Sequence, residues 1–205
     1  MKKTLVINYT PRHDSNTKKL TEFFINEIKD KTTLLYVDLA KETPDLLLEE
    51  NLNLLIKRNF IGEALSPSEQ SILQKNDDFA QQVLDTDFIV LTFPMFNLSV
   101  PATVKAWIHA VLQVNKTFRL TENGYEGLCK NKQALVLMTA GSEHTFNLAE
   151  PSEFATGLVK SCFNIIGIPT TQISANGMNV YPNKIEETLN TAKQKITATC
   201  LNWYK

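Results

Sequence analysis

Short apolar segments rich in β-branched residues alternate along this chain with longer segments whose apolar residues recur at helical spacing. Segments with the length and composition of strands lie at 4–9, 33–39, 88–93, 134–138 and 170–174. Helical patterns between them are typical of a parallel sheet with helices on both faces. The sequence therefore predicts an α/β fold with a doubly wound, five-stranded parallel sheet.

The helical segments carry start signals of their own. Ser66 can cap a helix, Pro67 fits its first position, and Glu69 completes a capping box. Leucine-rich residues 44–65 predict a helical excursion before it. No repeat or linker divides the 205 residues, so we expect one domain over 1–205. Further helices are expected at 16–29, from Pro101, from Ser152 to Ile166 before Gly167, and from Asn183 to about Trp203.

Charge and cysteine content narrow the class of protein. Lys and Arg number 21 against 22 Asp and Glu, which argues against a nucleic-acid or anionic-membrane partner. No apolar run has the length of a transmembrane helix or of a secretory signal. Cys129, Cys162 and Cys200 form neither a C-x-x-C pair nor a zinc pattern. We expect a cytoplasmic protein with buried, unreactive thiols.

The predicted topology indicates where a ligand should bind. Five strands suit the flavodoxin-like order 2-1-3-4-5, and such sheets bind ligands beyond the carboxyl ends of their strands. The binding place lies beside strands one and three, where the strand order reverses. The loops after strands one, three and four are therefore expected to form the site.

The first of these loops is rich in hydroxyls. Thr10, Ser15 and Thr17, together with free amides of the first helical turn, suit a phosphate. The alternative is that Ser15 only caps the helix. Neither G-x-G-x-x-G nor G-x-x-x-x-G-K-[ST] occurs in the chain, so a terminal monophosphate is expected rather than a pyrophosphate.

The second loop begins Pro94-Met95-Phe96-Asn97-Leu98. A large apolar pair directly beyond a strand end could flank a flat ring, and the neighbouring amide could supply its hydrogen bonds. A packed crossover loop is the competing interpretation.

The third loop is Thr139-Ala140-Gly141-Ser142. Its small residues let backbone amides approach a ligand closely. Ser142 and His144 also raise the possibility of a hydrolase, but the G-x-S-x-G elbow is missing. The three histidines form no metal-ligand pattern, so no metal site is expected.

Two stretches resemble a known family. Pro94-Met95-Phe96-Asn97 resembles the Pro-Met-[Tyr/Phe]-Asn signature of bacterial FMN-dependent NADH azoreductases, relatives of the NAD(P)H:quinone oxidoreductases. Residues 117–128, TFRLTENGYEGL, are similar to a second stretch of that family. The resemblance implies non-covalent FMN, one per chain, with NADH or NADPH as electron donor and quinones or azo compounds as acceptors. It also implies ping-pong two-electron transfer, with the flavin rather than a side chain carrying the reaction.

The resemblance also implies roles for individual positions. The flavin phosphate would meet Thr10, Ser15, Asn16 and Thr17, and the flavin ring would pack on residues 94–98. Its pyrimidine edge would face residues 139–142, where Ala140 and Ser142 replace an arginine and a glycine of the family pattern. The expected acceptor pocket would contain Phe118, Leu120, Tyr125, His144, Phe146 and Phe163.

Relatives complete each pocket from a neighbouring subunit, so a homodimer is expected. Two other functions stay open at this point. One is a single-electron carrier, which would be shorter and more acidic than this chain. The other is a regulatory module that has lost its flavin, which the substitutions at 140 and 142 would suit.

Overall fold

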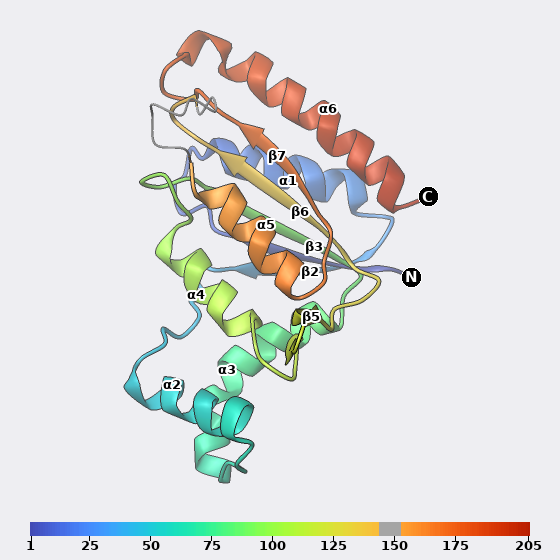
Figure 1. Cartoon of the computed structure of the whole chain (residues 1–205). Coiled ribbons are helices and arrows are strands. Elements are labelled where there is room, and N and C mark those ends of the chain that lie inside the picture. Colours follow the sequence, from blue (N-terminus) through green and yellow to red (C-terminus); the bar gives the residue numbers. More distant parts are fainter. Residues whose placement is uncertain (144–152) are drawn as a thin grey trace.

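A parallel sheet with strand order β2-β1-β3-β6-β7 forms the centre of the protein (Figure 1). The computed structural model describes residues 1–143 and 153–205. Every strand of this sheet coincides with a predicted segment, and the predicted order is confirmed. The strands are β1 (Lys3–Asn8), β2 (Thr33–Asp38), β3 (Phe88–Pro94), β6 (Gln133–Thr139) and β7 (Thr170–Ala175).

Helices cover both faces of this sheet, as the alternating pattern predicts. On one face α1 and α6 bury residues such as Leu20 and Ile196 against β1, β3 and β6. On the other face α3, α4 and α5 form a second core that includes Trp107 and Phe163. The helices are α1 (Asn16–Ile28), α3 (Pro67–Leu84), α4 (Ala102–Val111), α5 (Ala155–Ile165) and α6 (Ile185–Trp203).

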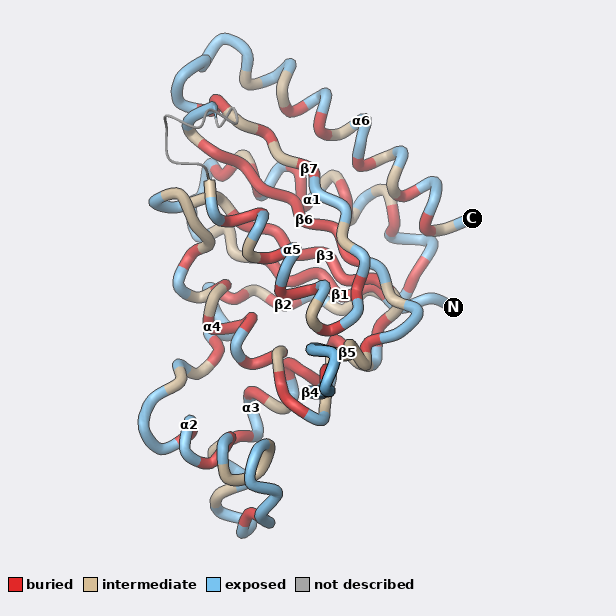
Figure 2. The backbone as a smooth tube through the Cα atoms, viewed as in Figure 1, coloured by how far each residue is buried: buried red, intermediate tan, exposed pale blue. Residues whose placement is uncertain are grey.

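The central strands are buried along nearly their whole length, whereas β2 and β7 at the edges are partly exposed (Figure 2). Continuous apolar sequence in β3 therefore reflects cover from both sides. The start of α3 has the predicted capping box, since Ser66 Oγ accepts from the Glu69 amide and Glu69 accepts from the Ser66 amide. None of the helices within the described residues is long and apolar enough to cross a membrane.

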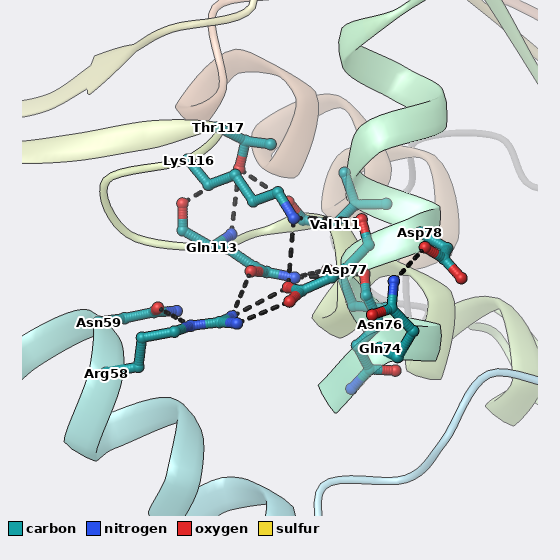
Figure 3. Close-up of polar contacts among 11 residues, drawn as sticks. Arg58, Asn59, Gln74, Asn76, Asp77, Asp78, Val111, Gln113, Lys116 and Thr117 are labelled. Carbon is teal, nitrogen blue, oxygen red and sulfur yellow. Dashed lines mark hydrogen bonds and ion pairs between the residues drawn. The ribbon is translucent and has the colours of Figure 1, made fainter. Parts of the chain in front are cut away.

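Residues 44–65 contain the expected helical excursion, α2 (Glu49–Ile56), which continues into a π-helical turn, η1 (Lys57–Ile61). Arg58 fastens this excursion to α3. Its guanidinium makes two bonds to Asp77, 2.6 and 2.9 Å long, and one to Gln113 (Figure 3). Lys116 pairs with the same carboxylate at 3.2 Å.

A small antiparallel hairpin was not expected from the sequence. It consists of β4 (Phe118–Thr121) and β5 (Gly124–Gly127). Its Gly127 lies so close to Gly167 that a Cβ atom there would come within 2.2 Å of the Gly167 amide nitrogen. Since Gly167 precedes β7, the hairpin lies at the amino edge of the sheet (Figure 1).

Two helix starts differ from the sequence-based expectation. The last helix begins at Ile185, because Asn183 falls in a 3-10 turn, η2 (Pro182–Lys184), that leads into it. The described part of α5 begins at Ala155, and the predicted cap Ser152 lies outside the described residues.

Candidate functional site

A cavity of about 470 Å³ opens at the carboxyl edge of the sheet. All three loops that the sequence singled out contribute to it, as does the loop after β7, which sequence reasoning missed. A volume of this size falls within the range typical of small-molecule sites. Lining residues include Ser15, Asn16, Met95, Phe96, Gly141 and Asn179.

The first loop supplies a helix N-terminus to this cavity. Ser15 caps α1 by accepting a hydrogen bond from the Lys18 amide at 3.2 Å, as the competing interpretation of this loop proposed. The amides of Asn16 and Thr17 have no hydrogen-bond partner within the described residues. Unpaired amides at a helix start favour an anion. Capping by Ser15 and anion binding by the following amides are therefore compatible.

Neither threonine of this loop is among the residues that line the cavity. Thr17 is fully buried, and its hydroxyl lies 2.7 Å from that of Thr139. It is absent from the cavity lining, which differs from the expectation that its hydroxyl meets a phosphate. Thr10 is half-buried, and the side chain of Asn8 donates to it at 2.9 Å.

The second loop contains a tight turn from Phe96 to Ser99, closed by two backbone hydrogen bonds. Its central residues, Asn97 and Leu98, have φ values of 48° and 65°. Asparagine tolerates this left-handed conformation, but leucine adopts it only at a cost of about 1–2 kcal/mol. The turn leaves Phe96 41 % exposed beside the cavity, with its ring edge-on to Tyr9. The cavity therefore has an aromatic side chain on a strained turn.

The third loop runs close to the loop that follows β7. The Gly141 carbonyl accepts from the Asn179 amide at 2.9 Å, and a Cβ on Gly141 would lie 2.5 Å from Asn179 Nδ2. Any larger residue at 141 would therefore displace the Asn179 side chain. Ala140 is buried, and its amide donates to the Ala175 carbonyl. The Gly141 and Ser142 amides have no partner in the part of the chain that the structure describes.

Charged side chains stand at the rim of the cavity. Arg12 forms an ion pair with Asp14 at 3.0 Å, and its hydrogen bonds hold the pKa of that carboxyl below its usual value. Lys19 donates to the side chain of Asn16 at 2.9 Å. The rim can therefore attract an anion before it reaches the unpaired amides.

The expected acceptor-pocket residues lie elsewhere in this chain. Phe163 is buried in the core, where its ring packs edge-on against Trp107 at 6.2 Å. Phe118, Leu120 and Tyr125 belong to the hairpin at the amino edge, opposite the cavity. None of these four lines the cavity of its own chain. His144 and Phe146 lie outside the described residues.

A family model described as "Flavodoxin-like fold" matches residues 2–200. The chain belongs to this flavodoxin-like family. A relative from Pseudomonas fluorescens strain Pf0-1, named FMN-dependent NADH:quinone oxidoreductase 2, is 32 % identical over 96 % of this chain and 98 % of its own. The FMN-dependent NADH:quinone oxidoreductase of Francisella philomiragia is 28 % identical, and the match covers 96 % of this chain and 97 % of that relative.

Solved structures agree with these flavodoxin-like relatives. An azoreductase from Bacillus anthracis str. Sterne superposes with a TM-score of 0.89 at 25 % identity, covering 99 % of this chain and 100 % of the other. An FMN-dependent NADH-azoreductase from Bacillus anthracis str. Ames Ancestor, solved in complex with FMN, gives 0.88 at 23 % identity, with both chains fully covered, and supports the fold. The family resemblance inferred from the loop motifs is confirmed.

Proposed function

We infer that this flavodoxin-like protein is an FMN-dependent NADH:quinone oxidoreductase with azoreductase activity. The observation that carries this conclusion is the meeting of the three loops at one cavity at the carboxyl edge of the sheet. Relatives matched over nearly the whole chain are named for this activity, which supports an enzyme over an electron carrier or a flavin-free module.

The residues around the cavity fit FMN. Its phosphate would bind the unpaired amides of Asn16 and Thr17, with the Thr10 and Ser15 hydroxyls beside them. A bound anion would give these amides the partner that the described residues do not supply. The side chain of Thr17 would contribute indirectly, by holding the first turn of α1 against Thr139.

The second and third loops would hold the ring. Met95 and Phe96 offer an apolar surface at the cavity wall, and Asn97 and Leu98 complete the turn that presents them. The unpaired amides of Gly141 and Ser142 would donate hydrogen bonds to negative charge at the edge of the ring. Since Ala140 has no charged side chain, these amides would be the main source of that stabilisation. FMN, when bound, supplies the chemistry of hydride acceptance from NADH and two-electron reduction of the acceptor.

We also propose a homodimer whose pockets are shared. Leu120 and Tyr125 are 55 % and 63 % exposed on the hairpin, at the edge of the sheet opposite their own cavity. Phe60 and Ile61 of η1 are comparably exposed. None of these side chains lines the cavity of its own chain. They could therefore take part in an FMN pocket only as part of a second copy of the chain. Light scattering beside activity at matching dilutions tests this, and a fully active single chain of 23.2 kDa would contradict it.

The location we propose is cytoplasmic, supported by three free, buried cysteines.

The purified protein tests the activity directly. We expect a flavin absorption spectrum that bleaches rapidly on addition of NADH without oxygen and returns when a quinone is added. A protein that acts only as an electron carrier would bleach slowly with NADH. A purified protein that neither holds nor takes up FMN would contradict the proposed function.

A further inference from the structure

A chain of buried polar side chains lies beneath the cavity and has no role in the function proposed above. It starts in α1 at Thr21, whose hydroxyl lies 3.0 Å from two acceptors, the Thr92 hydroxyl and the Thr17 carbonyl. Thr92 donates to Asn8 Oδ1 at 2.9 Å, and Asn8 Nδ2 donates to Thr10 Oγ1 at 2.9 Å. Thr21, Thr92 and Asn8 are at most 3 % exposed. This series of hydrogen bonds therefore connects the protein interior to the first loop.

This chain of bonds has a direction. Asn8 Oδ1 already accepts the proton of Thr92, which leaves its amide nitrogen to face Thr10. In a second, longer contact of 3.2 Å the Thr10 hydroxyl donates back to Asn8 Oδ1, an oxygen that Thr92 already supplies with a donor. Because buried amide donors are rarely left unpaired, Nδ2 keeps the Thr10 oxygen as its acceptor, and the Thr10 proton is held only by the longer contact.

The consequence falls on Thr10. A hydroxyl that accepts from Asn8 can still donate its own proton, and a phosphate oxygen needs only to replace the 3.2 Å contact with Asn8 Oδ1. Thr10 is half-buried in the first loop, directly before Pro11, which lines the cavity. A phosphate oxygen is the acceptor that gains most from such a donor, since hydrogen bonds to charged groups are the strong ones.

We propose that Asn8 is a positioning residue that sets the Thr10 hydroxyl as a hydrogen-bond donor to the FMN phosphate. The inference rests on the proposed phosphate site and adds residues that no loop motif identifies. Asn8 and Thr92 would thus determine how strongly the protein prefers FMN to riboflavin, which has the same ring but no phosphate.

Two variants change the direction of these hydrogen bonds in different ways. Asn8→Asp provides only acceptor oxygens when ionised, so Thr10 must donate inward. Thr92→Val keeps the side-chain shape, adds no charge, and removes the proton that fixes the Asn8 amide. Both should weaken FMN binding while riboflavin binding stays the same, by about tenfold for Asn8→Asp and several-fold for Thr92→Val.

The measurement is titration of apoprotein with FMN and with riboflavin, followed by flavin fluorescence. Thr4→Val is the matched control. Thr4 is a fully buried threonine of the same strand, and its hydroxyl bonds Thr32 and Tyr204 away from the loop. It should lower stability and leave the ratio of the two affinities unchanged.

A double-variant cycle separates positioning from simple charge repulsion. In a Thr10→Val background, Asn8→Asp should cost little further FMN affinity, because the hydroxyl it acts through is gone. An equal cost in both backgrounds would mean that the carboxylate acts only by its charge, and the proposal would be wrong. The isosteric Thr92→Val variant decides the matter if Asn8→Asp does not fold.

The outcomes also distinguish this inference from the proposed function. Equal affinity of the unaltered protein for FMN and riboflavin would overturn the phosphate site itself. A clear preference for FMN that Thr92→Val leaves untouched would keep the phosphate site and refute the role of Asn8.

Discussion

The hydroxyl oxygens of Thr17 and Thr139 lie 2.7 Å apart, although 122 positions separate the two residues in sequence. Both side chains are buried. The contact joins the first turn of α1 to the carboxyl end of β6, and thus the first loop of the site to the third. The first and third loops around the cavity are therefore fixed relative to one another inside the protein.

Replacing Thr17 by valine should lower the free energy of unfolding by about 1–3 kcal/mol, because the Thr139 hydroxyl loses its partner in a buried place. FMN affinity should change only a few-fold, since the amide of residue 17 remains. Urea unfolding and flavin titration measure the two effects, with Thr17→Ser as the control that restores the hydroxyl. Lost FMN binding at unchanged stability would show that the hydroxyl contacts the phosphate.

Leu98 should tolerate isoleucine poorly. The substitution conserves volume and apolar surface, but a β-branched side chain is strongly disfavoured at a φ of 65°. We expect a loss of about 1 kcal/mol or more in unfolding free energy, and weaker FMN binding because the turn presents Phe96. Leu112→Ile is the matched control, as Leu112 is also half-buried but has a φ of −79°. Equal losses in the two variants would argue against strain in the turn.

Asp77 should hold the excursion in place. Burial raises its pKa, but the bonds to Arg58 and Lys116 outweigh burial and bring the pKa below its usual value. The stabilisation is therefore present above the ordinary carboxyl pKa and is lost as the pH falls through the lowered one. At neutral pH, Asp77→Asn should cost about 1–2 kcal/mol, between the values typical of exposed and of buried pairs.

Trypsin provides a local measurement of the same contact, because Lys57 and Arg58 are both in η1. Cleavage there should be faster in Asp77→Asn than in the unaltered protein, since a loosened π-helical turn opens more often. Asp78→Asn is the control, because Asp78 bonds only Gln74 among the described residues. Unchanged cleavage in Asp77→Asn would mean that the apolar contacts of α2 suffice to hold the excursion.

The cysteines should resist alkylation in the native protein. Burial raises the pKa of the Cys129 and Cys200 thiols to about 11, and it also raises that of Cys162. Mass spectrometry after iodoacetamide at pH 8 should find no label on the folded protein and all three thiols labelled in denaturant. Rapid labelling of the native protein would contradict the buried positions.

The same thiols predict a loss of stability in alkali. Their folded pKa values lie above the ordinary value of 9.0, so the folded state keeps protons that the unfolded state releases. The stabilisation is complete below about pH 9 and is lost as the pH rises toward about 11. Replacing Cys200 by alanine should flatten this decline, which urea unfolding at several pH values measures.

Steady-state kinetics should follow a ping-pong scheme. Donor and acceptor have one cavity to occupy in turn, so neither should bind productively while the other is present. Initial rates against NADH at several quinone concentrations should give parallel reciprocal plots. Lines that meet at a point would require both substrates to bind at once.

Local sequence signals predicted much of this structure. The continuous apolar run of β3 indicated a strand covered on both faces, and the Ser66 capping box marked the start of α3 correctly. The three loops of the cavity followed from strand order alone, because parallel strands end at a common edge.

What the sequence did not predict depends on contacts between distant residues. The hairpin has two four-residue strands with Phe118 as the one buried side chain among Phe118–Thr121, so it has no clear period. Asn123-Gly124, a common turn pair, was the signal that could have identified it. Asn179 lies beside Gly141, and Thr17 is buried against Thr139. Both contacts join residues far apart in sequence, so no local sequence pattern predicts them.

The position of the hairpin has a consequence for mixtures of altered chains. If the pocket is shared, a chain with substitutions only in its hairpin still has intact FMN-binding loops. A chain with substitutions only in its FMN-binding loops still has an intact hairpin. Neither would be active as a pure protein. Combined in one dimer, the two would rebuild a single complete pocket, and activity would return on mixing without either chain being repaired.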